Sequence, residues 1–495
     1  MVNPPGTSLE TARADRSFFG HPRGLATLFF TEMWERFSYY GMRAILMFYM
    51  VSKVETGGLG FPVSKAGAVY GLYTAMVYLL SLPGGWVADR ITGQRRAVLY
   101  GGILISLGEF CLVVPTTMTF YIGLVLLMAG TGMLKPNVST IVGQLYAQGD
   151  VRRDSGFSIF YMGINLGALL APILCGWVGE KVGWRLGFGL AGIGMLAGLI
   201  QYVTGWKHLG TAGLKAADDP SRKPVPYTGI VTLVAVAAAG AFAASRWFQL
   251  EITPELISNA LGVLLVVLSI VVFSWLLLGK GWTHEERKRS AAILVLFVSS
   301  AVFWSAFEQA GSTLSLFAKR SIDRVVLGYQ FPASWFQDVE PTFVILFAPA
   351  FAWLWLAMAK REPSSPAKFT LGLVLVGLGY VLLLPAVALN AKGTLASPWW
   401  LVGTYWLHGL GELALSPVGL SSMTKLAPVR LAGFVMGLWF AATAIGNYMA
   451  GRMASLYEST SVSTLFGIAA VFAFGAALVL ALLIKPTVRL MSGVK

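Results

Sequence analysis

Long apolar runs recur along almost the whole chain. Six lie at about 24–50, 66–88, 96–115, 119–145, 157–178 and 184–206. Two more follow at about 227–246 and 256–279, and six others at about 291–318, 337–359, 368–389, 397–425, 430–452 and 462–484. An α-helix needs about 20 residues to cross a bilayer. With 56% hydrophobic and only 12% charged residues among 495, the sequence predicts an all-α polytopic membrane protein with about 14 transmembrane helices.

The grouping of these runs predicts the domain organisation. Six runs precede a polar, proline-containing linker at 207–226, and six follow the charged loop His284–Arg289. We expect an N-terminal six-helix bundle at 1–209, a linker with two extra transmembrane helices at 210–283, and a C-terminal six-helix bundle at 284–495. The two extra runs carry almost no internal charge, so a peripheral, structural role is predicted for them. Two equal blocks are typical of pseudo-symmetric transporters, which hold substrate near the midplane between their halves.

Basic residues alternate between loops and explain the net charge of +14. They gather in the N-terminal segment, at 89–96, in the linker, at 284–289, at 360–368 and at the C-terminus. Lys and Arg concentrate in cytoplasmic loops, so both termini are expected in the cytoplasm, and nucleic-acid binding is not predicted. Met1–Arg23 is polar and predicts no cleavable signal peptide. Cys111 and Cys175 lie in apolar runs, so no disulfide framework is predicted. The four histidines lack the spacing of metal ligands, so no metal site is predicted.

One stripe of the first run is polar. Its members share offsets of 0, 3, 4, 7, 8 and 11 along a helix, and they are Glu32, Glu35, Arg36, Tyr39, Tyr40 and Arg43. Charged groups in a membrane helix disfavour insertion by very roughly 2.5–3.5 kcal/mol each, so this stripe should face a bundle interior or a watery cavity. Internal pairing of Glu32 with Arg36 is the simpler alternative, but the set is larger than one ion pair needs.

Further polar residues lie deep in other runs. Lys135 precedes Pro136 in the fourth run and needs a counter-ion or a ligand carboxylate, and Asn165 is either a contact between helices or a ligand contact. Glu308 and Glu412 lie well inside their runs, and Glu340 near the start of its run. A further acid, Glu109 in the third run, has no evident partner in the sequence and is assigned a structural role.

Without Glu109, these residues place five acids (Glu32, Glu35, Glu308, Glu340 and Glu412) and three bases (Arg36, Arg43 and Lys135) in the expected cavity, which leaves two excess negative charges. A low-dielectric cavity resists such an excess. Protonation of one or two carboxylates would remove it, which predicts proton binding coupled to movement. A zwitterionic ligand would fit the same charges, with its cation near the acids and its anion near Arg43 and Lys135.

Several of these motifs carry a family resemblance. The loop Asp89–Arg96 is similar to the loop signature of the major facilitator superfamily. Glu32–Gly41 (EMWERFSYYG) resembles the ExxERFxYYG motif of proton-dependent oligopeptide transporters, and Phe160–Ala168 (FYMGINLGA) resembles their second signature. Lys135-Pro136 and the segment beginning at Glu412 also fit, and fourteen helices are typical of bacterial members. The resemblance implies a major facilitator fold and a proton-coupled symporter that imports di- and tripeptides, and peptide-like drugs, by alternating access.

The resemblance also implies residue roles. Proton coupling is assigned to Glu32, Glu35, Arg36 and Glu308. Substrate binding is assigned to Tyr39, Tyr40, Arg43, Tyr78, Lys135, Asn165, Trp304, Glu340, Glu412 and Trp439. Gate pairs are Arg43 with Glu308 and Lys135 with Glu412. The partners implied are peptides, protons and the lipid bilayer of the bacterial inner membrane, with the protein acting as a monomer and with protons as the coupling ion in place of any cofactor.

Two positions depart from the family pattern. Gly71 stands where mammalian members carry a histidine, so coupling here must depend on carboxylates. Glu340 stands where bacterial relatives commonly carry Asn, so the amine contact and the proton stoichiometry are open. A carrier of another small solute is the alternative. An enzyme is not predicted, because His408 lacks a matched nucleophile, and paired gating charges fit alternation better than a channel.

Overall fold

The structure is a computed structural model that describes residues 9–147, 150, 152–214, 253–358, 361–428 and 432–493. It is helical throughout its membrane-spanning part, as the apolar runs predict. A chain in lipid must satisfy its backbone hydrogen bonds within each segment, and a helix does so. Ten helical stretches of the described residues are long and apolar enough to cross a membrane. The expected span at 227–246 lies outside the described residues.

The N-terminal half begins with the short α1 (Leu9–Ala14). Its further elements are α2 (Arg23–Val51), η1 (Val54–Thr56), α3 (Val63–Leu79), α4 (Ser81–Val87), η2 (Ala88–Thr92), α5 (Gln94–Val113), α6 (Thr117–Gln144), α7 (Arg153–Ala171), η3 (Pro172–Gly176), α8 (Trp177–Lys181), α9 (Trp184–Gly205) and η4 (Trp206–Leu209). The second apolar run therefore comprises three helical pieces, and the fifth run comprises α7, η3 and α8. Pro172 opens η3, a single π-helical turn, as expected where a proline interrupts the regular ladder.

The C-terminal half repeats this plan with a short hairpin added. Its elements are α12 (His284–Phe307), η5 (Glu308–Gly311), α13 (Thr313–Ser321), β1 (Val325–Val326), β2 (Tyr329–Gln330), η6 (Ala333–Asp338), α14 (Val339–Met358), α15 (Ser365–Ala391), α16 (Trp399–Leu426), α17 (Ala432–Ser455) and α18 (Val462–Leu490). The strands β1 and β2 pair antiparallel. The seventh of the described spans is not one continuous helix, because it breaks at η5.

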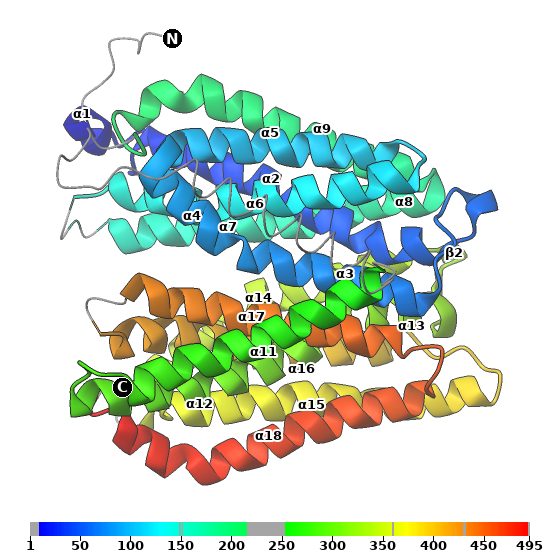
Figure 1. The fold of residues 1–495 in the computed structure, drawn as a ribbon. Helices are drawn as coiled ribbons and strands as arrows, with labels where there is room; N and C mark the ends of the chain where they lie inside the picture. Colours follow the sequence, from blue (N-terminus) through cyan, green and yellow to red (C-terminus); the bar gives the residue numbers. More distant parts are fainter. Residues whose placement is uncertain are drawn as a thin grey trace, which may run out of the picture.

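The two halves lie side by side with their helices roughly parallel to one direction (Figure 1). The blue-to-teal helices of the N-terminal half form one group, and the yellow-to-red helices form the other. α1 and the carboxyl end of α18 lie at the same end of the molecule, and the β1–β2 hairpin lies at the opposite end, here called the hairpin end. Two six-helix groups confirm the predicted major facilitator architecture.

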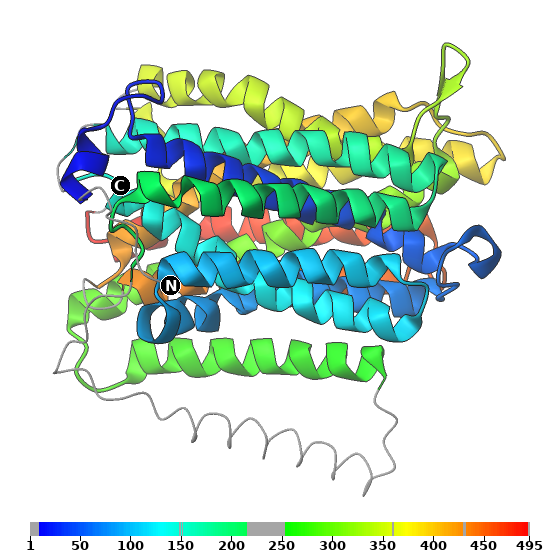
Figure 2. The same ribbon diagram turned by 90° about the horizontal axis from the view of Figure 1, so that it is seen from above.

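α11 (Pro254–Leu278) lies on the outside of this assembly (Figure 2). It packs on α3, α12 and α17. Most of its apolar side chains face outward, and Val263 and Val266 are 65% and 55% exposed. An apolar outer face is what a lipid-facing helix requires. The domain boundaries at 209 and 283 stay predictions, because the stretch from 215 to 252 is not described.

The halves meet most closely where α3 packs on α17. A Cβ added at Gly71 would lie 2.8 Å from the Cα of Gly451, and one added at Gly451 would lie 2.3 Å from the Cα of Gly71. Such distances leave no room for a side chain on either helix. Small residues allow backbones to approach in this way in membranes, so Gly71 serves as a contact surface in this chain.

Candidate functional site

The polar stripe of α2 is buried as predicted. Glu32, Glu35 and Arg36 are 2%, 0% and 3% exposed. The Nε atom of Arg36 lies 3.2 Å from Oε1 of Glu32 and also pairs with Oε2 of Glu35. One oxygen of each acid, Oε2 of Glu32 and Oε1 of Glu35, has no hydrogen-bond partner among the described residues. We call these three residues the coupling cluster. Because two carboxylates pair with one guanidinium group, the coupling cluster has one net negative charge, which a single proton would neutralise.

A second ion pair joins the two halves. Arg43 of α2 donates from Nη2 to Oε2 of Glu308, the first residue of η5, and from Nε to the hydroxyl of Tyr70 on α3 at 2.7 Å. Arg43 and Glu308 are 8% and 4% exposed. Close approach requires glycine at Gly311, where an added Cβ would lie 1.8 Å from the Tyr70 hydroxyl. The break in the helix at η5 thus brings Glu308 to Arg43.

Polar contacts also interlock the halves at the hairpin end. Gln337 of η6 donates to the carbonyl of Ala44 on α2 at 3.3 Å. The carboxylate of Glu180 on α8 accepts from the amide of Ser334 at 2.8 Å and lies 3.9 Å from Arg324. These contacts come from segments that the sequence alone does not bring together. They close the hairpin end of the molecule.

Lys135 occupies the predicted deep position on α6, half-buried between the halves. Its Nζ lies 4.1 Å from the centre of the Tyr78 ring, which gives a cation–π contact. It also lies within electrostatic range of the coupling cluster. Among the described residues Lys135 forms no ion pair with Glu412, so the second predicted gate pair is not made in this conformation.

Glu340 and Glu412 meet on the opposite side. They come from the first turn of α14 and from the middle of α16, and their carboxyl groups lie within hydrogen-bonding reach of each other. Two carboxyl groups can share such a bond only when one carries a proton. Both residues are half-buried. The pair therefore offers one acidic site to a ligand, with a proton to lose.

The other predicted polar residues contact neighbours within the N-terminal half. The side-chain amide of Asn165 donates a hydrogen bond to the carbonyl of Tyr161 in the same helix at 2.9 Å, so this hydrogen bond does not join two helices. The guanidinium groups of Arg36 and Arg43 lie 5.3 Å and 6.0 Å from the ring centres of Tyr39 and Tyr40. The Tyr39 hydroxyl has no partner among the described residues.

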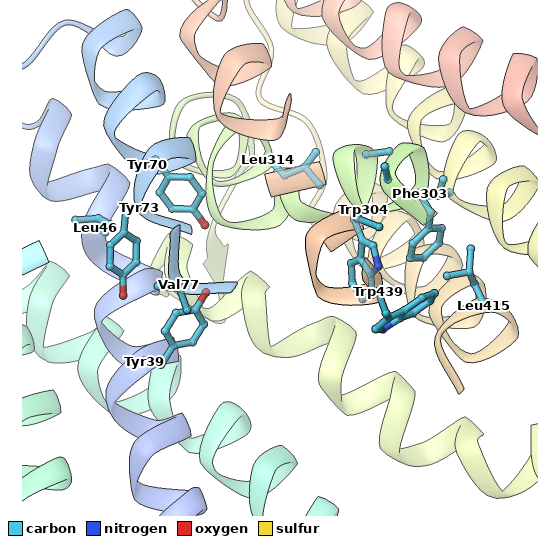
Figure 3. Close-up of a cluster of buried hydrophobic side chains, with 14 of the residues drawn as sticks. Tyr39, Leu46, Tyr70, Tyr73, Val77, Phe303, Trp304, Leu314, Leu415 and Trp439 are labelled. Atoms are coloured by element: carbon cyan, nitrogen blue, oxygen red, sulfur yellow. The ribbon is translucent and has the colours of Figure 1, made fainter. Parts of the chain in front are cut away.

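Aromatic side chains from both halves belong to one cluster of buried hydrophobic residues. Figure 3 shows Tyr39, Tyr70 and Tyr73 from the N-terminal half on one side, with Trp304 and Trp439 from the C-terminal half on the other. Trp304 and Trp439 are 8% and 3% exposed. Sequence reasoning did not select Tyr70, because a tyrosine in an apolar run has the same pattern as a core aromatic. Only its bond to Arg43 distinguishes it.

This arrangement defines a class of protein. Two six-helix bundles joined at one end by a buried ion pair, with half-buried charges of both signs between them, are the features of a carrier of the major facilitator type. The model of the POT family matches residues 95–473. The chain belongs to the POT family of transporters.

Relatives match over nearly the full length. The chain is 43% identical to the "Uncharacterized transporter YclF" of Bacillus subtilis, and the match covers 100% of both chains. It is 40% identical to the "Peptide transporter YePEPT" of Yersinia enterocolitica, with 96% of both covered. It is 37% identical to a "Di-/tripeptide transporter" of Lactococcus lactis, with 98% of this chain and 99% of the relative covered.

Solved structures agree with this assignment. A crystal structure of a peptide transporter POT in complex with sulfate is 41% identical, with a TM-score of 0.90, and the match covers 98% of this chain and 100% of that one. A POT family transporter in complex with 5-aminolevulinic acid is 37% identical, with a TM-score of 0.89 and coverage of 95% and 98%.

Proposed function

We propose that this protein is a proton-coupled symporter that imports di- and tripeptides by alternating access. The observation that carries the proposal is the Arg43–Glu308 pair, which joins the halves on one side of a set of half-buried charges. Relatives at 37% and 40% identity carry the names of peptide transporters. The family is one of transporters, and we expect no enzymatic activity and no cofactor, with protons as the coupling ion.

The charges between the halves suit a zwitterion. Lys135, half-buried beside Tyr78, would meet the peptide carboxylate together with Arg43. Glu412, within reach of Glu340, would meet the amino terminus, with Asn165 nearby. Tyr39, Tyr40 and Tyr78 would donate to the peptide backbone, and Trp304 and Trp439 would wall the side-chain pockets. Fixed charges at both ends with apolar walls would accept many side chains but limit peptide length.

The two gates would operate in alternation. In the conformation described, Arg43 pairs with Glu308 while Lys135 and Glu412 are not paired. A carrier must not open both sides at once. Protons from the periplasm would neutralise the coupling cluster and the Glu308 carboxylate, which would release Arg43 and open the hairpin end. After peptide binds, the halves would rock, and loss of the protons inside would release the peptide and restore the Lys135–Glu412 pair.

The setting follows from the same proposal. The described basic loops at 89–96 and 284–289 lie at the same end of the molecule as α1 and the carboxyl end of α18, opposite the hairpin end. Because such loops stay cytoplasmic, we place both termini in the cytoplasm, the hairpin end toward the periplasm, and the protein in the bacterial inner membrane. The site lies within one chain, so a functional monomer suffices.

Uptake into proteoliposomes tests the proposal. With an inward proton gradient, labelled dialanine should accumulate intact, a protonophore should abolish accumulation, and unlabelled di- and tripeptides should compete while alanine and a tetrapeptide should not. Lys135→Ala should weaken both driven uptake and dialanine binding. Gradient-driven flux that dipeptides do not affect would assign the carrier to another solute, and dialanine recovered inside as free alanine would indicate chemistry in place of transport.

A further inference from the structure

A groove lies between α14, α15 and α16 at the end of the C-terminal half opposite the hairpin end, where α14 and α16 end and α15 begins. Its volume is about 450 Å³, within the range of about 300–1,000 Å³ that is usual for ligand sites. Ser421 of α16 lines the groove and follows Glu412 by nine residues, or two and a half helical turns. The groove is therefore on the opposite side of α16 from Glu412, and it is separate from the proposed peptide site.

The lining of the groove changes from apolar to polar along the helices. On α16 it extends from Leu413 to Lys425, and this distance is about 18 Å along the helix axis. Leu413 and Phe351 of α14 line the part that is deeper in the molecule, whereas Lys425 and Lys368 of α15 lie at the end of the molecule. A phospholipid has the same order, with its acyl chains deep in the bilayer and its headgroup at the surface.

Lys368 is the buried charge of this groove. Its side chain is only 7% exposed, and its ammonium group pairs with the carboxylate of Glu362. Its Nζ also lies 4.5 Å from the centre of the Trp355 ring. Glu362 belongs to the loop before α15, and its side chain is 46% exposed. A buried ammonium group requires an anionic partner, whereas an exposed carboxylate loses little when it turns to water. Another anion can therefore replace Glu362 beside Lys368.

The charge of the groove favours an anionic ligand. Its described lining contains two bases, Lys368 and Lys425, and one acid, Glu362, so one positive charge is in excess. The amino-terminal end of α15 lies in the groove and contributes the positive end of the helix dipole. In the proposed setting this end of the molecule faces the cytoplasm, and basic pockets between helices on that side of a membrane bind anionic lipid headgroups.

We propose that this groove binds an anionic phospholipid of the cytoplasmic leaflet, with the phosphate on Lys368 and one acyl chain along the apolar part. The phosphate replaces the Glu362 carboxylate, which turns to water, so Lys368 keeps an anionic partner throughout. Lys425 contacts the headgroup at the rim, and Phe351 contacts the acyl chain. The lipid leaves the opposite face of α16 free for the peptide. This inference goes beyond the proposed symport and does not depend on which solute the protein carries.

Native mass spectrometry of the purified full-length protein in detergent tests the proposal. The probes are dioleoylphosphatidylglycerol and dioleoylphosphatidylcholine, which have the same acyl chains but differ in net charge. We expect the wild-type protein to bind the anionic lipid at least about tenfold more tightly, and Lys368→Gln to remove most of this preference. Lys288→Gln is the matched control, because it removes the same charge at the same end of the molecule from an exposed ion pair. It should keep the wild-type preference.

Glu362→Gln distinguishes a lipid site from a purely structural ion pair. Because it removes the carboxylate that competes with the phosphate, the affinity for dioleoylphosphatidylglycerol should rise by roughly two- to fivefold. An ion pair that only stabilises the fold would lower the thermal midpoint in this variant and leave the lipid affinity unchanged. Glu362 is exposed, so this variant also decides the question should Lys368→Gln fail to fold.

Four results would overturn the proposal. Equal affinity of the wild-type protein for the two lipids would show that the groove does not recognise the anionic headgroup. An undiminished preference in folded Lys368→Gln would assign the lipid to another surface. Unchanged affinity in Glu362→Gln would make the ion pair structural. Displacement of the bound lipid by inorganic phosphate alone would assign the groove to a free anion in place of a lipid.

Discussion

Replacing Glu308 with glutamine should weaken the closure of the hairpin end. The substitution keeps the size of the side chain but removes the charge that Arg43 holds across the two halves. The Arg43 guanidinium would still bind the Tyr70 hydroxyl at 2.7 Å. It would lose its charged acceptor, so the conformation that depends on this bond should become less populated.

The magnitude follows from the burial of the pair. Hydrogen bonds to charged groups contribute about 1.5–3 kcal/mol, and each 1.4 kcal/mol is tenfold in an equilibrium constant. Since the pair joins the halves only when the hairpin end is closed, Glu308→Gln should shift the closed-to-open ratio by about ten- to a hundredfold. Spin labels at Val54 and Leu395, which are 66% and 54% exposed and lie on different halves, would report this by pulsed electron–electron distance measurements in nanodiscs.

A matched exposed pair provides the control. Arg320 and Glu458 form an ion pair at 3.1 Å with side chains 42% and 53% exposed, and both belong to the C-terminal half. Exposed pairs contribute roughly 0–1 kcal/mol, so Glu458→Gln should leave the distance distribution as in wild type. A Glu308→Gln distribution that matches wild type would refute the idea that Arg43–Glu308 holds the hairpin end closed.

Three further predictions concern coupling, packing and local stability. Glu35→Gln should abolish proton-driven dialanine uptake while leaving counterflow largely intact, because it removes a proton-binding group of the coupling cluster, and loss of both activities would argue against a purely coupling role. Gly451→Val should prevent α3 and α17 from meeting, because a Cβ there would lie 2.3 Å from the Cα of Gly71; a folded, active variant in size-exclusion and uptake assays would contradict this. Thr283→Ala should lower the free energy of unfolding by about 1 kcal/mol, because it removes the capping box at the start of α12, and an unchanged thermal midpoint would show that the cap contributes nothing.

The helical architecture could be predicted from the sequence because lipid leaves few alternatives. Every expected span within the described residues is helical, and the charged stripe of α2 is buried as its spacing indicates. The interruptions within the membrane-spanning helices were not predictable from the sequence. The run at 291–318 is continuous in hydropathy, yet its α-helix ends before Glu308, where η5 begins. There Glu308 pairs with Arg43, and Gly311 lies against the Tyr70 hydroxyl. Such a break depends on tertiary contacts.

The sequence indicated which residues form the candidate site better than it indicated which of these residues contact one another. Arg43 and Glu308 are 265 residues apart, and their pairing came from the family resemblance, not from spacing. The proximity of Glu340 to Glu412 has no signal in the sequence, since it depends on how α14 packs on α16. Nor does a sequence specify which gate is closed, so only a structure could show that Lys135 and Glu412 are apart and that Lys135 lies against the Tyr78 ring.

Proton movement driven by a peptide gradient alone would distinguish proton symport from uncoupled peptide uptake. Proteoliposomes containing a pH-sensitive dye would be held at equal pH on both sides and then given dialanine outside. Acidification of the lumen that scales with dialanine concentration, and that Glu35→Gln eliminates, is the predicted result. Dialanine uptake without any change in luminal pH would contradict proton symport by this protein.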